Sequence, residues 1–320
     1  MTALDSVPGL SSSLTAEDFG VHRPALLGYC YRMLGSAADA DDAVQETMVR
    51  AWRSIDTFEG RAPLEAWLYR IATNVCLNLL RGRRRRALPM DVARAASAYA
   101  PLGTPHGHEV WVEPIADALI TSQGADPGEI AATRESVRLA FVAALQLLPP
   151  RQRAVLILRD VLRWKADEVA ALLDMSVVSV KSALQRARAT LALTPPSPPA
   201  PADRELLDRY LDAFGRYDID ALVGLLRDDA TLSMPPYDLW LLGVEEIRAW
   251  FLGRARECAN SVFVPIEVNG TLGFTQHRRS GVGGALEPFA VTVLEAVDGR
   301  IAAIHAFLDP AAVARLQSAG

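Results

Sequence analysis

Residues 147–193 decide the fold of the middle of the chain and read LLPPRQRAVLILRDVLRWKADEVAALLDMSVVSVKSALQRARATLAL. The two prolines suit the start of a helix, and the apolar pattern continues that helix through Arg163. A shorter helix is predicted over residues 166–173, and a three-residue turn begins at Asp174, which tolerates the left-handed conformation. Ser176 can then cap a long third helix.

The third helix of this stretch has one apolar and one polar side. The apolar side repeats at intervals of three and four and is expected to pack inward: Val177, Val180, Leu184, Ala187 and Leu191. The polar side carries three basic residues and no acids: Ser179, Lys181, Ser182, Gln185, Arg186 and Arg188. This spacing is typical of a helix-turn-helix whose last helix contacts DNA bases and phosphates. The alternative is a plain helical hairpin.

Residues 38–56, ADADDAVQETMVRAWRSID, also show a helical pattern. One face carries small and apolar residues, among them Ala40, Val44 and Met48. Acidic and polar residues lie away from that face, and three aspartates near the start suit the helix dipole. From this segment alone, a solvated amphipathic face and a protein-binding face are equally good interpretations.

Residues 63–86, PLEAWLYRIATNVCLNLLRGRRRR, predict a helix that ends in five arginines within six residues. Trp67, Tyr69, Arg70, Asn74 and Asn78 are expected to project from it. Clustered arginines repel one another and are typical of phosphate binding, and rings beside them suit melted DNA. A solvated helix end is the alternative for the arginines, and core packing is the alternative for Trp67.

Taken together, these pieces resemble the extracytoplasmic-function (ECF) group of the bacterial sigma-70 family. The resemblance identifies residues 17–90 with region 2 and residues 130–193 with region 4, joined by a linker over 91–129. It implies binding to the β′ clamp helices and β flap of core RNA polymerase. The residues that it implies for contact with core polymerase are Asp42, Gln45, Glu46 and Trp52. It implies contact of Trp67, Arg70, Asn74, Asn78, Arg81 and Arg84 with the −10 element. The residues that it implies for contact with the −35 element are Ser179, Lys181, Ser182, Gln185, Arg186 and Arg188.

The segment TPPSPPAPAD divides the chain, because so many prolines cannot continue a helix or fill a central strand. We place a linker at 194–202 and a third domain at 203–318. The third domain holds 17 acids and 11 arginines, whereas residues 1–202 hold 21 acids and 22 basic residues. The overall charge of −5 therefore belongs to the third domain and does not argue against DNA binding by the first two.

The third domain reads as helices followed by antiparallel strands, which predicts an α+β cone. Asp298 and Gly299 give a hairpin turn between the last two strands. The pattern resembles the SnoaL-like branch of the NTF2-like superfamily, which is fused to sigma factors of the mycobacterial sigma G and sigma J types. The fold class is thus two all-α sigma domains followed by an NTF2-like cone.

Two sets of residues are expected around this third domain. Trp111, Glu113 and Pro114 in the linker resemble a motif of the fused families that contacts the extra domain. Pocket candidates in the cone are Met234, Tyr237, Trp240, Trp250, Phe289, His305 and Phe307, and Asp309 ends the last strand.

We expect an alternative sigma factor, cytoplasmic, without cofactor, metal site or membrane segment, and not an enzyme. Its partners would be core polymerase, promoter DNA and possible regulators: an anti-sigma factor or a small ligand of the third domain. The sequence does not decide whether the third domain activates or inhibits. Two alternatives stay open: a helix-turn-helix regulator that never docks on polymerase, and a SnoaL-like isomerase or hydrolase using His305 or Asp309.

Overall fold

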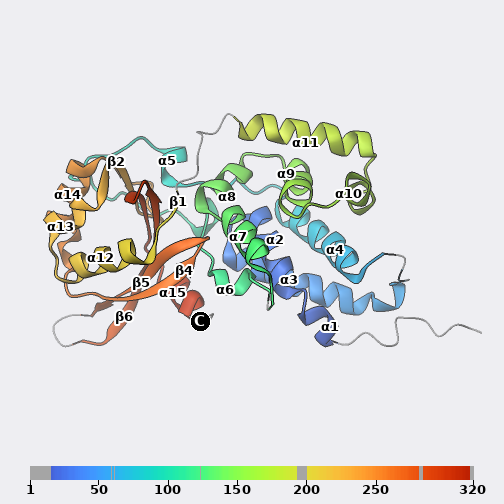
Figure 1. Cartoon of the computed structure of the whole chain (residues 1–320), viewed down its shortest axis with the longest axis horizontal. Helices are drawn as coiled ribbons and strands as arrows, with labels where there is room; N and C mark the ends of the chain where they lie inside the picture. The colour runs from blue at the N-terminus through green and yellow to red at the C-terminus, as the bar shows by residue number, and fades with distance from the viewer. Residues whose placement is uncertain are drawn as a thin grey trace, which may run out of the picture.

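The computed structural model describes residues 16–58, 60, 62–122, 124–192, 200–280 and 284–317. Figure 1 shows a helical half and a half built around a β-sheet lying side by side, with the linker running between them. The order of elements agrees with the predicted fold class. No helix in these described ranges is long and apolar enough to cross a membrane.

The first domain is a bundle of α1 (Ala16–Gly20), α2 (Arg23–Leu34), α3 (Ala37–Arg53) and α4 (Leu64–Leu79). Gly35 ends α2 in the left-handed conformation, and Ser36 caps α3 by accepting a hydrogen bond from the Asp39 amide at 3.0 Å. The inward side of α2 is fully buried, with Tyr29 packed edge-on against Tyr69 of α4. Helices α2 and α3, joined by this sharp connection, both pack against α4.

The linker and the second domain are built from a series of helices, most of them short. These elements are α5 (Pro89–Val92), α6 (Asp117–Ile120), α7 (Pro127–Ser136), α8 (Leu139–Gln146), α9 (Pro150–Leu156), a π-helical segment (Ile157–Val161), α10 (Ala166–Leu173) and α11 (Val177–Leu191). Asp126 and Glu129 form a reciprocal capping box at the start of α7. The predicted helices over 166–173 and after Ser176 are confirmed.

The third domain holds a mixed sheet in the order β3-β2-β7-β6-β5-β4, with β1 added beside β6. Its elements are β1 (Ala200–Pro201), α12 (Arg204–Gly215), α13 (Ile219–Gly224), β2 (Leu226–Ser233), β3 (Trp240–Leu242), α14 (Val244–Leu252), β4 (Val262–Val268), β5 (Thr271–Arg279), β6 (Leu286–Val297), β7 (Arg300–Phe307) and α15 (Pro310–Gln317). Asp298 and Gly299 both have positive φ, as the predicted β6–β7 turn requires.

Several features of the third domain differ from the sequence prediction. Strands β2 and β7 pair in parallel, so the sheet is mixed rather than antiparallel throughout. Helix α15 and the short strand β3 were not predicted, because each is short and has little period of its own. Ala200 and Pro201, predicted as linker, pair with β6, and residues 194–199 of that linker lie outside the described residues.

Two hydrophobic cores hold the molecule together, and neither follows the domain boundaries. One core joins regions 2 and 4 and also includes third-domain residues, among them Val291, Phe307 and Val313. The other fills the cone between the opposite face of the sheet and helices α12–α14, and includes Ala98 of the linker. The sheet therefore presents one face to the helical domains and the other to its own helices.

Candidate polymerase and nucleic-acid interface

The four residues predicted to meet polymerase lie on the outer side of α3. Asp42, Gln45 and Glu46 are exposed and share one face because they are three or four residues apart. Trp52 is 54% exposed and packs edge-on against Phe19, with 6.2 Å between ring centroids. An exposed tryptophan next to an acidic face is a typical protein-binding surface.

The residues predicted to read the −10 element also share a face, here on α4: Trp67, Arg70, Asn74 and Asn78. Arg70 and both asparagines are exposed, whereas Trp67 is half-buried with its ring 5.2 Å from that of Phe58. The prediction that Tyr69 projects with them is wrong, because Tyr69 faces the core and is 1% exposed. The remaining face is polar and accessible, as contact with bases requires.

The arginine cluster that follows α4 divides into two kinds of residue. Arg81 and Arg84 are exposed, whereas Arg83 and Arg86 both bind Asp39, at 2.8 and 2.7 Å. Arg86 is 8% exposed and also donates to two backbone carbonyls of the linker. Phosphate binding by the whole cluster is therefore contradicted at Arg86, which ties the linker to region 2.

The helix-turn-helix of region 4 has the local geometry that the sequence predicts. Asp174 adopts the left-handed conformation (φ 52°, ψ 50°), and the Ser176 hydroxyl accepts a hydrogen bond from the Ser179 amide at 3.1 Å. Within the predicted inward stripe, Val180, Leu184 and Ala187 are buried. Val177 is 38% exposed, so the prediction is wrong at that position, which lies in the first, outermost turn.

The outward side of α11 is open except at its far end. The exposed residues are Ser179, Lys181, Gln185, Arg186 and Arg188, and Ser182 is half-buried. Arg186 donates to the Ser182 hydroxyl at 2.6 Å. Arg188 makes two hydrogen bonds to Asp160, at 2.8 and 2.7 Å, so its guanidinium already has an intramolecular partner. The three other charged or amide side chains, Lys181, Gln185 and Arg186, remain presented outward.

Regions 2 and 4 are in direct contact. Arg70 of α4 donates to both carboxylate oxygens of Asp174 at 3.1 Å, across an exposed boundary. Deeper in the boundary, Arg153 of α9 is 3% exposed and donates to the Met33 carbonyl of α2 and to Gln146 Oε1. Burial lowers the pKa of Arg153 to about 10. Regions 2 and 4 are thus joined by one exposed ion pair and by several buried hydrogen bonds.

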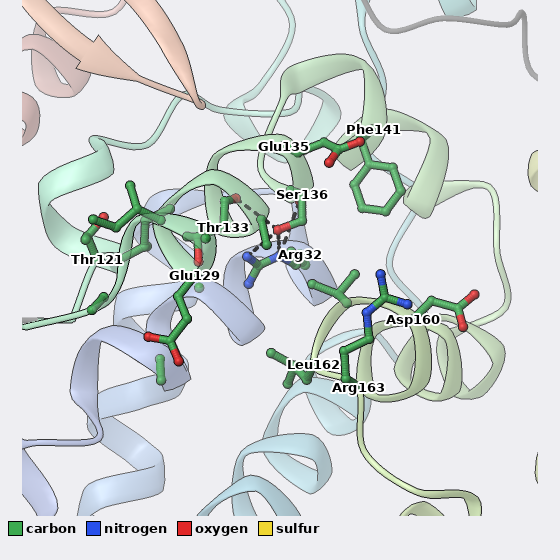
Figure 2. Close-up of a pocket in the computed structure, with 18 of the residues that line it drawn as sticks. Arg32, Thr121, Glu129, Thr133, Glu135, Ser136, Phe141, Asp160, Leu162 and Arg163 are labelled. Carbon is green, nitrogen blue, oxygen red and sulfur yellow. Dashed lines mark hydrogen bonds between the residues drawn. The ribbon is translucent and has the colours of Figure 1, made fainter.

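A cleft of about 1060 Å³ opens between α2, α7 and the end of the region 4 helices (Figure 2). Arg32 is buried at its base and donates to the Ser136 hydroxyl at 2.6 Å. Glu129 and Arg163 also line the cleft, and Figure 2 shows them on opposite sides of the view. Regions 2 and 4 are therefore in contact at the base of the cleft, and the cleft separates them on the solvent side.

The linker residues predicted to contact the third domain lie between the two halves. The Trp111 indole donates to the Pro236 carbonyl at 3.0 Å. Glu113 is buried and accepts a hydrogen bond from Ser36 at 2.7 Å, and Pro114 is buried beside it. From the other side, the Trp240 indole donates to the carbonyl of linker residue Ala93 at 3.0 Å. Trp240 is therefore an interdomain residue rather than part of the cone cavity.

A buried asparagine that the sequence analysis did not single out joins the three domains. Asn269, in the β4–β5 turn, is 0% exposed. Its Oδ1 accepts from the Ile115 amide of the linker at 3.0 Å. Its Nδ2 donates at 2.7 Å to the Tyr31 hydroxyl of region 2 and to the Val137 carbonyl that precedes α8. The Asn-Gly pair predicts the turn, but no local signal shows that the turn is inserted between domains.

Two buried carboxyl groups lie near this joint. Burial raises the pKa of Asp117 to about 6, although the Gly270 amide donates to it at 2.9 Å. Burial raises the pKa of Glu295 in β6 to about 7, and Arg138 lies 3.9 Å away. Both Glu295 and Arg138 are about 4% exposed, so the boundary between region 4 and the sheet contains a charge pair removed from water.

The cone contains a cavity of about 140 Å³. Of the predicted pocket residues, Met234, Trp250 and Phe289 line it, whereas Tyr237, Trp240, His305 and Phe307 do not. His305 is buried, bonded to the Ser233 hydroxyl at 2.9 Å, and burial lowers its pKa to about 4. Asp309 caps α15 by accepting from the Ala311 amide at 2.8 Å. Neither candidate base faces the cavity.

Family models match all three parts of the chain. Sigma-70 region 2 matches residues 19–86, Sigma-70 region 4 matches 138–191, and the SnoaL-like domain matches 207–304. The ECF RNA polymerase sigma factor SigG of Mycobacterium tuberculosis is 44% identical over 311 residues, which cover 91% of this chain and 81% of SigG. This chain belongs to the ECF sigma factors.

A second relative shares the whole arrangement of this sigma factor. SigJ of Mycobacterium tuberculosis is 27% identical over 311 residues, covering 93% of this chain and 92% of SigJ. The crystal structure of SigJ matches with a TM-score of 0.61 at 23% identity, covering 94% of this chain and 98% of that one. This likeness shows the fold, a pair of helical sigma domains followed by an NTF2-like domain.

The protein is therefore an alternative sigma factor for RNA polymerase that carries a SnoaL-like domain. The family assignment is confirmed, and the alternative of a helix-turn-helix regulator outside the sigma family is set aside. The surfaces on α3, α4 and α11 stay predictions at the level of single residues.

Proposed function

We propose that this sigma factor rests in a closed form, held by its SnoaL-like domain, that must open before it can use both promoter elements. The observation that carries the proposal is the contact of α4 with the turn before α11, through Arg70 and Asp174. Packed helices lie about 10 Å apart. Elements centred near −35 and −10 are some 25 positions apart, roughly 85 Å along straight duplex DNA.

The SnoaL-like domain is the proposed clamp because it contacts every part of the sigma module. Asn269 binds region 2, the linker and the start of region 4 with its one side chain. Third-domain residues such as Val291 and Phe307 extend the core of the helical domains. A signal that loosens these contacts, either an anti-sigma factor or a small ligand, would shift the equilibrium between closed and open forms.

In the open form, each exposed surface takes the role that the family pattern gives it. The face of α3 around Asp42 and Trp52 would dock on the β′ clamp helices. Asn74 and Arg84 represent the surface for the −10 element, and Lys181 and Gln185 represent the one for the −35 element. Exposure of all these side chains supports the assignment, and a factor with these activities would act in the cytoplasm.

The SnoaL-like domain acts here without catalysis. Its buried histidine is held neutral beside Ser233 and does not face the cavity. Asp309 is used to start a helix. A general base must lie within hydrogen-bond reach of its substrate, and neither residue lines the cone cavity in which a substrate would bind.

Run-off transcription with sigma-free core polymerase tests the proposal. The full-length chain should give promoter-dependent transcripts, and Asn269→Ala should give more transcript at limiting sigma because the clamp is weakened. A chain ending at residue 193 is a weaker test, since it exposes core residues that the third domain covers. No promoter-dependent transcript from any form would contradict the function, and equal output from Asn269→Ala and the parent would contradict the clamp.

A further inference from the structure

The cavity in the cone has the walls of a small-molecule site. Five aromatic side chains surround it: Tyr210, Phe214, Trp250, Phe251 and Phe289. Its volume of about 140 Å³ is close to that of cavities known to bind a single benzene ring, roughly 150 Å³. Ligand sites are typically apolar hollows with few polar groups, and this cavity has that composition.

Polar groups lie at one side of the cavity. Gln276 is 4% exposed and donates to the Ser261 hydroxyl at 2.8 Å. Thr292 is 3% exposed and lines the cavity in the middle of β6. The Cys258 thiol lies beside them, and burial raises its pKa. This side can form hydrogen bonds to the polar end of an otherwise apolar molecule.

The rim of the cavity carries a net positive charge. Three charged residues line it: Arg254, Arg278 and Glu257. Arg278 lies over the Phe289 ring at 4.4 Å and pairs with Glu257 at 3.2 Å, so those two charges offset each other. Arg254 lies 5.5 Å from the Trp250 ring centroid, and its charge is left in excess at the rim. A ligand with one negative charge would complement it.

The linker between regions 2 and 4 contributes part of the wall. Leu102 lines the cavity, and the chain on either side of it is tied to the third domain. The Ala96 amide donates to the Trp240 carbonyl at 2.8 Å, and the His106 amide donates to the Pro236 carbonyl at 2.8 Å. A molecule in the cavity would therefore touch the segment that connects the two DNA-reading domains.

We propose that the cone cavity binds a small monocarboxylate with one ring, or a branched chain of similar size, between its aromatic walls, Arg254 and Leu102. The inference concerns binding and goes beyond the proposed clamp, because the site can be occupied whether or not the third domain restrains regions 2 and 4. Its test therefore uses no transcription.

The reactivity of the Cys258 thiol, which lines the cavity, can report whether a ligand is bound there. The other two cysteines of the chain, Cys30 and Cys76, are 0% exposed, so a small thiol reagent should modify the folded chain at Cys258. The rate of modification by methyl methanethiosulfonate, followed by intact mass, is measured with benzoate, benzyl alcohol or benzylamine present. Cys258→Ser, which should show no fast modification, is the control for the site of reaction.

We expect benzoate to slow modification of Cys258 in a saturable way, benzyl alcohol to act more weakly and benzylamine not to act. Arg254→Gln should weaken protection by benzoate about twofold to fivefold, the effect of one exposed charge, measured relative to the rate of that variant without ligand. Leu102→Ala should let the larger ring of 2-naphthoate protect, which it should not do in the parent chain. Arg254 and Leu102 are exposed or half-buried, so both variants should fold, and circular dichroism checks this.

Equal protection by benzoate and benzylamine would overturn the assignment of a carboxylate. Absence of protection by all three compounds would overturn the site itself. If 2-naphthoate protects the parent chain as well as Leu102→Ala, the linker does not form the wall, and that part of the proposal fails. None of these outcomes depends on whether the clamp exists.

Discussion

The boundary between regions 2 and 4 and the boundary between region 2 and the SnoaL-like domain are built differently. Regions 2 and 4 meet partly through the exposed pair of Arg70 and Asp174, whose side chains are 49% and 77% accessible. The SnoaL-like domain meets region 2 through Asn269 and Tyr31, which are both fully buried. Surface ion pairs contribute about 0–1 kcal/mol, whereas breaking buried hydrogen bonds costs more.

This difference indicates which contacts hold the closed form. The buried contacts at Arg153 and Asn269 should dominate, and the exposed pair should adjust the equilibrium only slightly. The Asp174 carboxylate is already in contact with water in the closed form. Its separation from Arg70 should therefore cost little free energy. Variants at these residues should therefore differ in how much stability they lose.

Arg153→Ala should lower the free energy of unfolding by about 3–5 kcal/mol, because several buried carbonyl acceptors lose their donor, each at a cost of about 1–3 kcal/mol. The parent side chain bonds to Met33, Gln146 and Leu148. Arg151→Ala is the matched control, an exposed arginine two residues earlier on α9. Urea denaturation measures both variants, and equal effects would show that the buried contact has no special role.

Asn269→Ala should lower the free energy of unfolding by about 3 kcal/mol, since three hydrogen bonds between domains lose their partner. Asn260→Ala controls for backbone strain, because Asn260 also has positive φ but is exposed. Thermal denaturation of both variants separates the loss of the bonds from the cost of the left-handed conformation. If the losses in free energy of unfolding of the two variants differ by less than about 0.5 kcal/mol, Asn269 does not hold the domains together.

Stability should depend on pH through Glu295. Its pKa is raised from 4.5 to about 7 in the folded chain, so the folded form holds the proton more tightly than the unfolded form. The free energy of unfolding should therefore fall as pH rises through 7, by on the order of 1–3 kcal/mol between pH 5 and pH 8.

Glu295→Gln isolates this effect from the opposite effect of His305, whose lowered pKa destabilises the fold as pH falls below about 6.5. The free energy of unfolding of the parent minus that of Glu295→Gln should decrease from pH 5 to pH 8. A difference that is constant with pH would show that Glu295 keeps an ordinary pKa.

Asp174→Asn should have the smallest effect, below about 1 kcal/mol on stability and at most about fivefold on binding of a −10 single strand. Asparagine tolerates the left-handed conformation at this position, so only the charge is removed. Asp167→Asn, an exposed acid in the first turn of α10, the helix that Asp174 follows, is the control. A loss of several kcal/mol would mean that the exposed pair, rather than the buried joint, holds the domains.

Local features of this protein could be predicted well from the sequence. The turn at Asp174, the cap at Ser176 and the stripe of Val180, Leu184 and Ala187 depend on neighbours along the chain, and the structure contains them. The Asp-Gly turn between β6 and β7 is of the same kind. The sequence also placed Trp111 and Glu113 between the sigma domains and the third domain through their resemblance to a family motif.

Features that depend on distant residues could not be predicted. Nothing near Arg86 shows that Asp39 draws it out of the basic cluster, and nothing near Asn269 shows that three domains meet there. His305 was a pocket candidate because strand residues alternate, but which side of the sheet encloses the cavity depends on the packing of α12–α14. Tyr69 was misplaced for a similar reason, since its face of α4 is covered by α2.

Regions 2 and 4 should be held together in the free protein and should separate on the promoter. Spin labels on Asp56→Cys and Ala171→Cys, two exposed sites, would report this distance in a Cys258→Ser background. Pulsed electron paramagnetic resonance should give one short distance for the free chain. With core polymerase and promoter DNA the distance should increase by tens of ångströms. The same distance in both states would contradict the closed form.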